Sequence, residues 1–131
     1  MERDKQRTGS AILVAFVIAL LMKTFLFDFM LTEGQSMTPA IPAGTVLLVD
    51  KLSYGLRLPW TKRYLCLWAK PKRGDVVIFY TPRGQIAVKR CAGLEERDTF
   101  IALGDNSLQS YDSRSYGPIP INNIIGKVLG N

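Results

Sequence analysis

The chain has 131 residues, a formal net charge of +6, no histidine and only two cysteines. Its length fits one small domain. The absence of histidine excludes a Ser/His/Asp catalytic triad, and the cysteines lack the spacing of a zinc site, so no metal and no other cofactor is expected. The basic residues are scattered, which favours a solvated surface beside anionic lipid headgroups over a nucleic-acid interface.

An apolar segment lies close to the N-terminus. Residues 11–22 are apolar without interruption, and apolar residues resume beyond Lys23 as far as Leu31. A helix needs about 20 residues to cross the hydrocarbon core, and residues 10–31 satisfy this if Lys23 extends toward the headgroups. A cleaved signal peptide would need a small-x-small site after the apolar run, which is missing. A buried helix of a soluble domain would not be apolar on every face.

The apolar segment is therefore predicted to be an uncleaved membrane anchor. Arg3, Lys5 and Arg7 precede it, and the positive-inside rule then places the N-terminus in the cytoplasm. Five extended residues reach at most about 17 Å, so Ser36 is expected near the outer surface of the membrane. The predicted segments are a cytoplasmic N-terminus (1–9), a transmembrane anchor (10–31) and an extracytoplasmic domain (32–131).

Beyond the anchor, the sequence predicts a small, mostly β domain. A turn signal at residues 81–84 (Thr-Pro-Arg-Gly) joins two strand candidates into a hairpin. No long segment of helical periodicity follows the anchor. The strand candidates are rich in β-branched and apolar residues and cover 45–50, 75–80, 85–91, 99–103 and 124–129.

Two features leave alternatives open. Residues 53–72 mix aromatic with basic side chains, which favours a loop that contacts lipid headgroups. The alternative is an ordinary loop whose aromatic side chains pack onto the core. Cys66 and Cys91 either form a disulfide in an oxidising compartment or remain free thiols.

Ser36 and Lys89 are the candidates for nucleophilic chemistry. Without histidine, a nucleophilic serine needs another activator, and a lysine held neutral is a common one. Side chains alternate along a strand, so Lys89 shares a face with Ala87 and Cys91. Burial on that face would lower the pKa of the lysine. From the strand alone, a lysine on a solvated face is the favoured alternative.

Four motifs, taken together and in order, resemble the type I signal peptidases, the membrane-anchored Ser/Lys leader peptidases. The resemblance runs from about residue 11 to residue 120. Each motif is weak alone, but four in order behind an anchor are specific. They are Ser-Met-Thr-Pro at 36–39, Arg-Gly-Asp-Val-Val at 73–77, Val-Lys-Arg at 88–90 and the polar run 104–114.

The resemblance implies a role for each matching residue. Ser36 matches the nucleophile, and its backbone N–H would serve the oxyanion hole. Lys89 matches the general base, and Ser110 matches the serine that orients this lysine. Asp112 and Arg114 match a charged pair that supports the loop behind the site. Together these residues form a nucleophile, a base and an orienting group.

The chain also departs from the family pattern. Gly34 stands where some relatives carry a serine that adds a hydroxyl donor to the oxyanion hole, so no side-chain donor is expected there. Residues 93–98 lack the proline and second glycine of the usual turn, and Ser107 replaces a usual arginine. Only residues 99–103 separate the region of the base, which extends to residue 98, from the polar run, and larger relatives insert a second β domain at that point. We expect a minimal catalytic core.

The resemblance implies a small all-β Ser/Lys peptidase core behind one transmembrane helix. It implies a serine endopeptidase in the inner membrane, with its catalytic domain outside, that cleaves exported preproteins after small residues (Ala-x-Ala). The expected partners are these preproteins and the lipid bilayer, without nucleic acid; the sequence does not indicate an oligomeric state. The alternatives are a specialised Ser/Lys processing peptidase, as in conjugative pilus maturation, or an inactive membrane adaptor.

Overall fold

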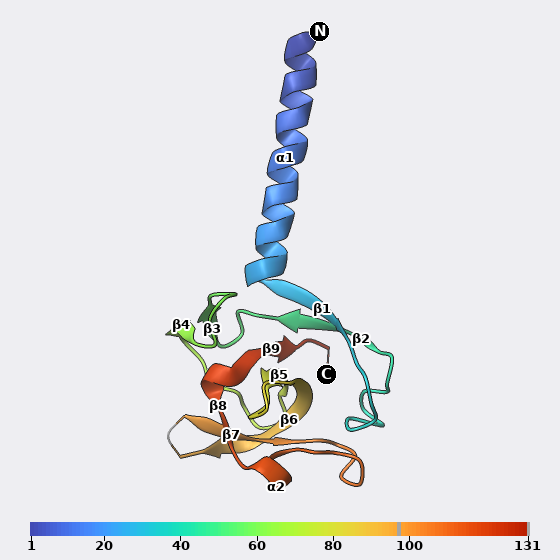
Figure 1. The fold of residues 1–131 in the computed structure, drawn as a ribbon, viewed down its shortest axis with the longest axis vertical. Helices are drawn as coiled ribbons and strands as arrows, with labels where there is room; N and C mark the ends of the chain where they lie inside the picture. The colour runs from blue at the N-terminus through green and yellow to red at the C-terminus, as the bar shows by residue number, and fades with distance from the viewer. Residues whose placement is uncertain (97, 131) are drawn as a thin grey trace.

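The structure is a computed structural model that describes residues 1–96 and 98–130, and it consists of a long helix followed by a β domain (Figure 1). In chain order the elements are α1 (Glu2–Phe25), β1 (Phe27–Leu31), β2 (Val46–Asp50), β3 (Gly55–Arg57), β4 (Tyr64–Leu67), β5 (Val76–Tyr80), β6 (Ile86–Glu95), β7 (Thr99–Leu103), α2 (Ser113–Tyr116), β8 (Ile119–Pro120), the 3-10 helix η1 (Ile121–Asn123) and β9 (Ile124–Val128).

Helix α1 stands away from the β domain, and none of its residues is buried (Figure 1). Within the described residues it is the one helix long and apolar enough to cross a membrane. The hydroxyl groups of Thr8, Ser10 and Thr24 donate to carbonyls four residues earlier, so these polar side chains are satisfied within the helix. Lys51 Nζ donates to the carbonyls of Lys23 and Thr24 and thereby caps the C-terminal end of the helix.

The helix ends earlier than the predicted anchor of residues 10–31. It stops at Phe25, and residues 27–31 form β1, which pairs with β2 from Phe27↔Asp50 to Leu31↔Val46. The physical reason is a change of period, because side chains of β1 alternate between exposed and half-buried positions. The helix also begins earlier, at Glu2, so its 24 residues still extend about 36 Å.

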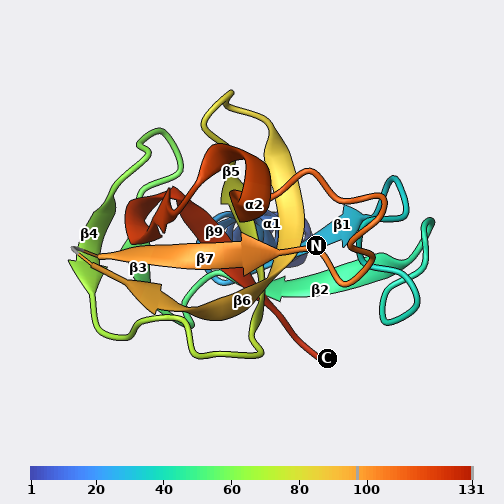
Figure 2. The same cartoon turned by 90° about the horizontal axis from the view of Figure 1, so that it is seen from below.

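Seven strands form one curled antiparallel sheet in the order β1-β2-β9-β5-β6-β7-β8, and β3 pairs with β4 separately (Figure 2). The mostly β class and the five predicted strands are confirmed, although the strand predicted at 85–91 continues to Glu95. The sequence analysis missed β1, β3, β4, β8 and the short helix α2.

The core lies on both faces of the curled sheet. Strand β5 shows this best, because four successive residues, 76–79, are completely buried. Val77 and Phe79 belong to one apolar cluster, in which Phe79 meets Phe100 edge to face with ring centroids 5.5 Å apart. Val76 and Ile78 belong to the other cluster, which packs beneath the β1–β2 connection. The central strand is thus fixed from two sides.

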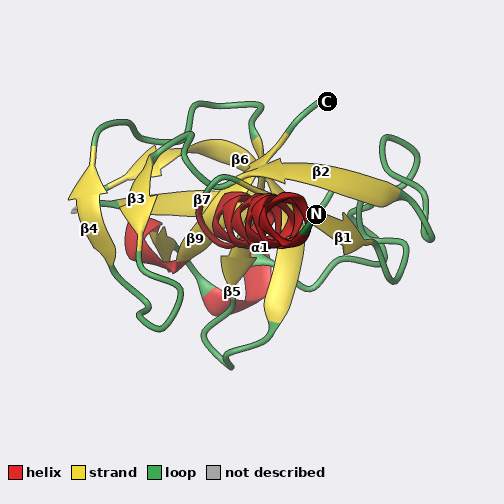
Figure 3. Ribbon diagram, turned by 90° about the horizontal axis from the view of Figure 1, so that it is seen from above, coloured by secondary structure: helices red, strands yellow, loops and turns green. Residues whose placement is uncertain are grey.

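The segment 53–72 forms the β3–β4 hairpin at the end of the domain opposite to β1 and β2 (Figures 2 and 3). Tyr64 packs against the core, whereas Trp60 and Trp68 are 76% and 56% exposed. The segment therefore places one aromatic side chain on the core and leaves others exposed. Its contact with lipid headgroups stays a prediction. Cys66 is exposed and Cys91 is buried, and both are free thiols, so the disulfide alternative is wrong.

Candidate active site

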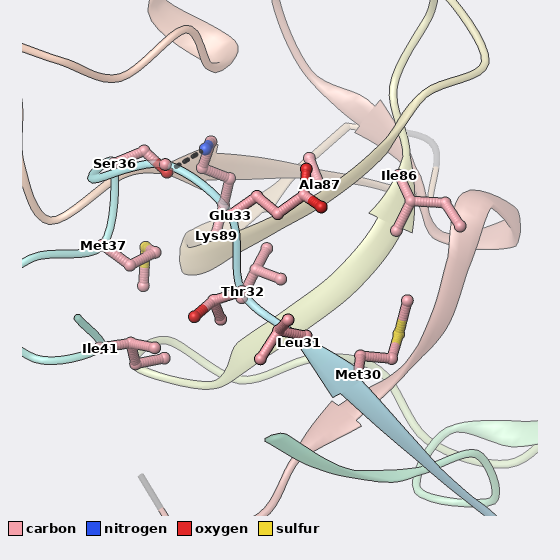
Figure 4. A pocket seen from close by; sticks show the side chains of 12 residues that line it. Met30, Leu31, Thr32, Glu33, Ser36, Met37, Ile41, Ile86, Ala87 and Lys89 are labelled. Atoms are coloured by element: carbon pink, nitrogen blue, oxygen red, sulfur yellow. Dashed lines mark hydrogen bonds between the residues drawn. The ribbon is translucent and has the colours of Figure 1, made fainter. Parts of the chain in front are cut away.

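Ser36 and Lys89 meet although 53 residues separate them in the sequence. Lys89 Nζ donates a hydrogen bond to Ser36 Oγ over 2.7 Å (Figure 4). Ser36 lies in the irregular connection between β1 and β2, where the chain turns sharply. Lys89 lies on β6, whose register against β5 places it opposite Val77. The curl of the sheet brings this connection over β6, and it thereby joins a potential nucleophile to a potential base.

Lys89 is buried, with only 6% of its surface exposed. Burial lowers the pKa of its ammonium group below the ordinary value of 10.5, and the negative charge of Asp112 opposes that shift. The alternative of a lysine on a solvated face is therefore wrong. A buried lysine with a lowered pKa reaches its neutral, proton-accepting form at a lower pH than a free lysine does.

Asp112 is the centre of a second group of polar residues. It is fully buried and accepts hydrogen bonds from Ser110 Oγ at 2.6 Å, from Arg114 Nη2 at 2.5 Å and from the backbone N–H of Gly104 at 2.8 Å. It also caps α2 by accepting from the N–H of Arg114. Burial alone would raise the pKa of this carboxyl, but the bonds from Arg114, Ser110 and Gly104 hold the pKa well below its ordinary range. Asp112 therefore stays charged.

The structure brings the five predicted residues into two groups. Ser36 and Lys89 contact each other directly, and Ser110, Asp112 and Arg114 form the other group. The hydroxyl of Ser110 donates to Asp112, and within residues 1–96 and 98–130 no hydrogen bond joins Ser110 to Lys89. The predicted orientation of Lys89 by Ser110 remains a prediction, while the charge of Asp112 acts on Lys89 through space.

Gly104 is where the two groups meet, and the sequence analysis did not single it out. A Cβ at this buried position would lie 2.0 Å from Ser110 Oγ and 2.8 Å from the carbonyl oxygen of Ser36. Such distances leave no room for any side chain. The only sequence signal was its place at the start of the polar run. Gly104 allows the polar run to approach the backbone of Ser36.

Ser36 and Lys89 open onto a cavity of about 320 Å³ (Figure 4). One wall comes from β1 and the β1–β2 connection, and the other comes from the first residues of β6. Glu33 is the carboxylate of this lining, which is otherwise largely apolar, and the sequence analysis also missed it. The lining residues are Met30, Leu31, Thr32, Glu33, Gly34, Ser36, Met37, Ile41, Ile86, Ala87, Val88 and Lys89.

Comparisons with known proteins agree with the motifs. A family model described as "Signal peptidase, peptidase S26" matches residues 5–96 and 95–130. Signal peptidase I of Buchnera aphidicola subsp. Schizaphis graminum is 33% identical over 89 residues, which cover 67% of this chain and 28% of that protein. Signal peptidase I of Bacillus caldolyticus is 24% identical over 180 residues, which cover 98% and 92% of the two chains.

A mitochondrial relative extends the comparison. The mitochondrial ATP-independent inner membrane protease subunit 1b of Arabidopsis thaliana is 27% identical over 151 residues, which cover 97% of this chain and 82% of that protein. The match spans less than a third of the Buchnera relatives but most of the Bacillus and Arabidopsis proteins. The family model covers nearly the whole chain, and the resemblance to type I signal peptidases is confirmed. This chain belongs to the signal peptidase family S26 of serine peptidases.

Proposed function

We propose that this protein is a membrane-anchored serine endopeptidase that removes signal peptides from exported preproteins. The observation that carries this proposal is the 2.7 Å hydrogen bond from Lys89 Nζ to Ser36 Oγ, at the mouth of an open cavity, in a chain of the signal peptidase family. In this account Ser36 is the nucleophile and Lys89 is the general base.

The proposed reaction follows from the positions of these two groups. The neutral amine of Lys89 takes the proton of Ser36 Oγ as that oxygen attacks the scissile carbonyl carbon. The N–H of Ser36 donates to the oxyanion that forms. Lys89 then gives the proton to the leaving amine as the C–N bond breaks, which leaves an acyl ester on Ser36. A water molecule, deprotonated by Lys89, hydrolyses the ester and regenerates both groups.

The cavity suggests how a substrate binds. Strand β1 is an edge strand of the sheet, and its last residues, Met30 and Leu31, line the cavity beside Ser36. An extended peptide that pairs with such an edge alternates its side chains between two faces. Residues −1 and −3 then face the cavity wall together, while residue −2 points away. This alternation supports joint recognition of residues −1 and −3, and the preference for small residues there (Ala-x-Ala) is what the resemblance to type I signal peptidases implies.

The anchor and the neighbouring strands support a site at the membrane surface. Strand β1 begins two residues after α1 ends, and its outward side chains Phe29 and Leu31 are 70% and 62% exposed. Val46, opposite Leu31 on β2, is exposed on the same face. We infer that this apolar face rests on the bilayer, with the N-terminus in the cytoplasm and the β domain on the outer side. Preproteins anchored by their own signal peptides then reach Ser36.

Substrate selection tests the proposed function. The full-length protein in detergent is incubated with a preprotein that carries an Ala-x-Ala site, and with the same preprotein carrying phenylalanine at −1. We expect cleavage of the first after the −1 alanine and no cleavage of the second, as determined by N-terminal sequencing of the product. Equal cleavage of both, or cleavage elsewhere, would contradict the proposed function.

The rate of cleavage is expected to rise with pH. Only the neutral amine of Lys89 accepts a proton, and burial lowers the pKa of this lysine, so kcat/KM should increase through one apparent pKa below the ordinary lysine value of 10.5. Below that pKa the amine is protonated and activity falls. The measurement is kcat/KM for a peptide substrate from neutral to alkaline pH. A profile that is flat over this range would argue against a lysine base.

A further inference from the structure

The backbone N–H of Ser36 carries the oxyanion hole in the proposed function, on which the following inference rests. Within residues 1–96 and 98–130 this N–H donates to no acceptor, so it is free to bind a developing oxyanion. Gly34 offers no hydroxyl group beside it. Stabilisation of the oxyanion therefore depends on the direction in which the Ser36 N–H points.

Asn106, which lies outside the turn, holds the peptide unit between Gln35 and Ser36. Its side-chain Nδ2 donates to the carbonyl oxygen of Gln35 at 3.1 Å, and its backbone N–H donates to the carbonyl oxygen of Ser36 at 2.8 Å. The peptide bond between Gln35 and Ser36 is planar and trans, so the Gln35 C=O and the Ser36 N–H point in opposite directions. A donor that fixes this carbonyl therefore also fixes the direction of the N–H.

The turn itself also contacts the Gln35 carbonyl, but from within the same segment. The N–H and Oγ1 of Thr38 also donate to the Gln35 carbonyl, at 3.2 and 2.8 Å, but Thr38 belongs to the same turn and moves with it. Asn106 belongs to the polar run after β7, and β7 pairs with β6, which carries Lys89. Asn106 thus ties the Gln35–Ser36 peptide to the strands that position the base.

We propose that Asn106 is a positioning residue. Its side-chain amide directs the Ser36 N–H toward the oxyanion and holds that N–H in place relative to Lys89. An N–H that is misdirected by a few tenths of an ångström loses strength in the transition state, where the charge develops, and much less in the bound substrate. Loss of the amide is therefore expected to lower kcat and to leave KM nearly unchanged.

Three variants test this role. Asn106→Ala removes the amide and keeps the backbone N–H, and we expect kcat to fall about tenfold, below the 10²- to 10³-fold cost of deleting a donor. Asn106→Asp keeps the size but accepts instead of donating, so its loss should be at least as large. The matched control is Asn123→Ala, which removes an amide bond of 3.0 Å to the Tyr80 carbonyl, outside the cavity. Its kcat should stay within twofold of the wild type.

The readouts separate positioning from a general structural role. All variants are measured as full-length protein in detergent, with melting temperature, kcat, KM and the pH midpoint of kcat/KM. We expect the midpoint to be unchanged in Asn106→Ala, because no charge near Lys89 changes, whereas the added carboxylate of Asn106→Asp should raise it. A kcat for Asn106→Ala equal to that of Asn123→Ala, or a loss that appears in KM, overturns the inference.

Two further outcomes are assigned in advance. If Asn106→Ala does not fold, the isosteric Asn106→Asp carries the test, and a wild-type kcat in that variant overturns the inference. A wild-type protein that cleaves no preprotein overturns the proposed function instead, so the two failures are distinguishable.

Discussion

Lys89→Met is expected to lower kcat/KM by at least about 10⁴-fold while the protein still folds. Methionine fills nearly the same buried space without an ionisable group, so packing against β5 is retained. Removal of the amine leaves Ser36 without a proton acceptor, and the members of a nucleophile–base pair act as a unit. The measurement is steady-state cleavage of a preprotein, with the melting temperature of each protein recorded in the same detergent.

The matched control for this loss is Lys70→Met. Lys70 is also a lysine, but it is exposed, and its ion-pair partner is Asp98 rather than a residue of the cavity. A surface ion pair contributes about 0–1 kcal/mol to stability, so this variant should be as active as the wild type. Substantial cleavage by Lys89→Met at any pH would rule out Lys89 as the base.

Gly104→Ala is expected to reduce kcat/KM by about 10²-fold or more. The added Cβ would lie 2.8 Å from the carbonyl oxygen of Ser36, which is backbone and cannot move without displacing Ser36, the proposed nucleophile. It would also lie 2.0 Å from Ser110 Oγ and disturb the bond from Ser110 to Asp112. A displacement of about 1 Å at a catalytic group is enough for a loss of this size. Overpacking should also cost about 1–3 kcal/mol of the free energy of unfolding.

Gly9→Ala is the control for the glycine substitution. A Cβ at Gly9 meets no atom within 4 Å, and alanine favours the helix in which this residue lies. Its activity should equal that of the wild type. Undiminished cleavage by a folded Gly104→Ala protein would show that the polar run does not need to approach Ser36 so closely.

The strands that the sequence predicted have a strong local signal. The residues of β5 are all apolar or aromatic and lie between turn residues, and both faces of the strand prove to be buried. Strand β1 has no such boundary, because four of its five residues continue the apolar composition of α1. Its period of two became visible only in its pairing with β2. Composition predicted the anchor, but it could not predict where helix gives way to strand.

The sequence predicted which residues make up the candidate site, but not how they are arranged in space. The absence of histidine and the motif around Ser36 pointed to a lysine, and Lys89 has a buried position on its strand. Their contact depends on the curl of the sheet, which arises from pairings between distant strands and leaves no local signal. The hydroxyl of Ser110 is a different case, since it donates to Asp112, only two residues away, whereas the sequence analysis assigned it to Lys89.

The most direct test of the proposed Ser/Lys mechanism compares the wild type with Ser36→Ala on one preprotein that carries an Ala-x-Ala site. Both full-length proteins are purified in detergent, and the products are identified by N-terminal sequencing. We predict that the wild type cleaves after the −1 alanine and that Ser36→Ala, with an unchanged melting temperature, produces no cleavage. Cleavage at the same bond by Ser36→Ala, or no cleavage by the wild type, would contradict the account.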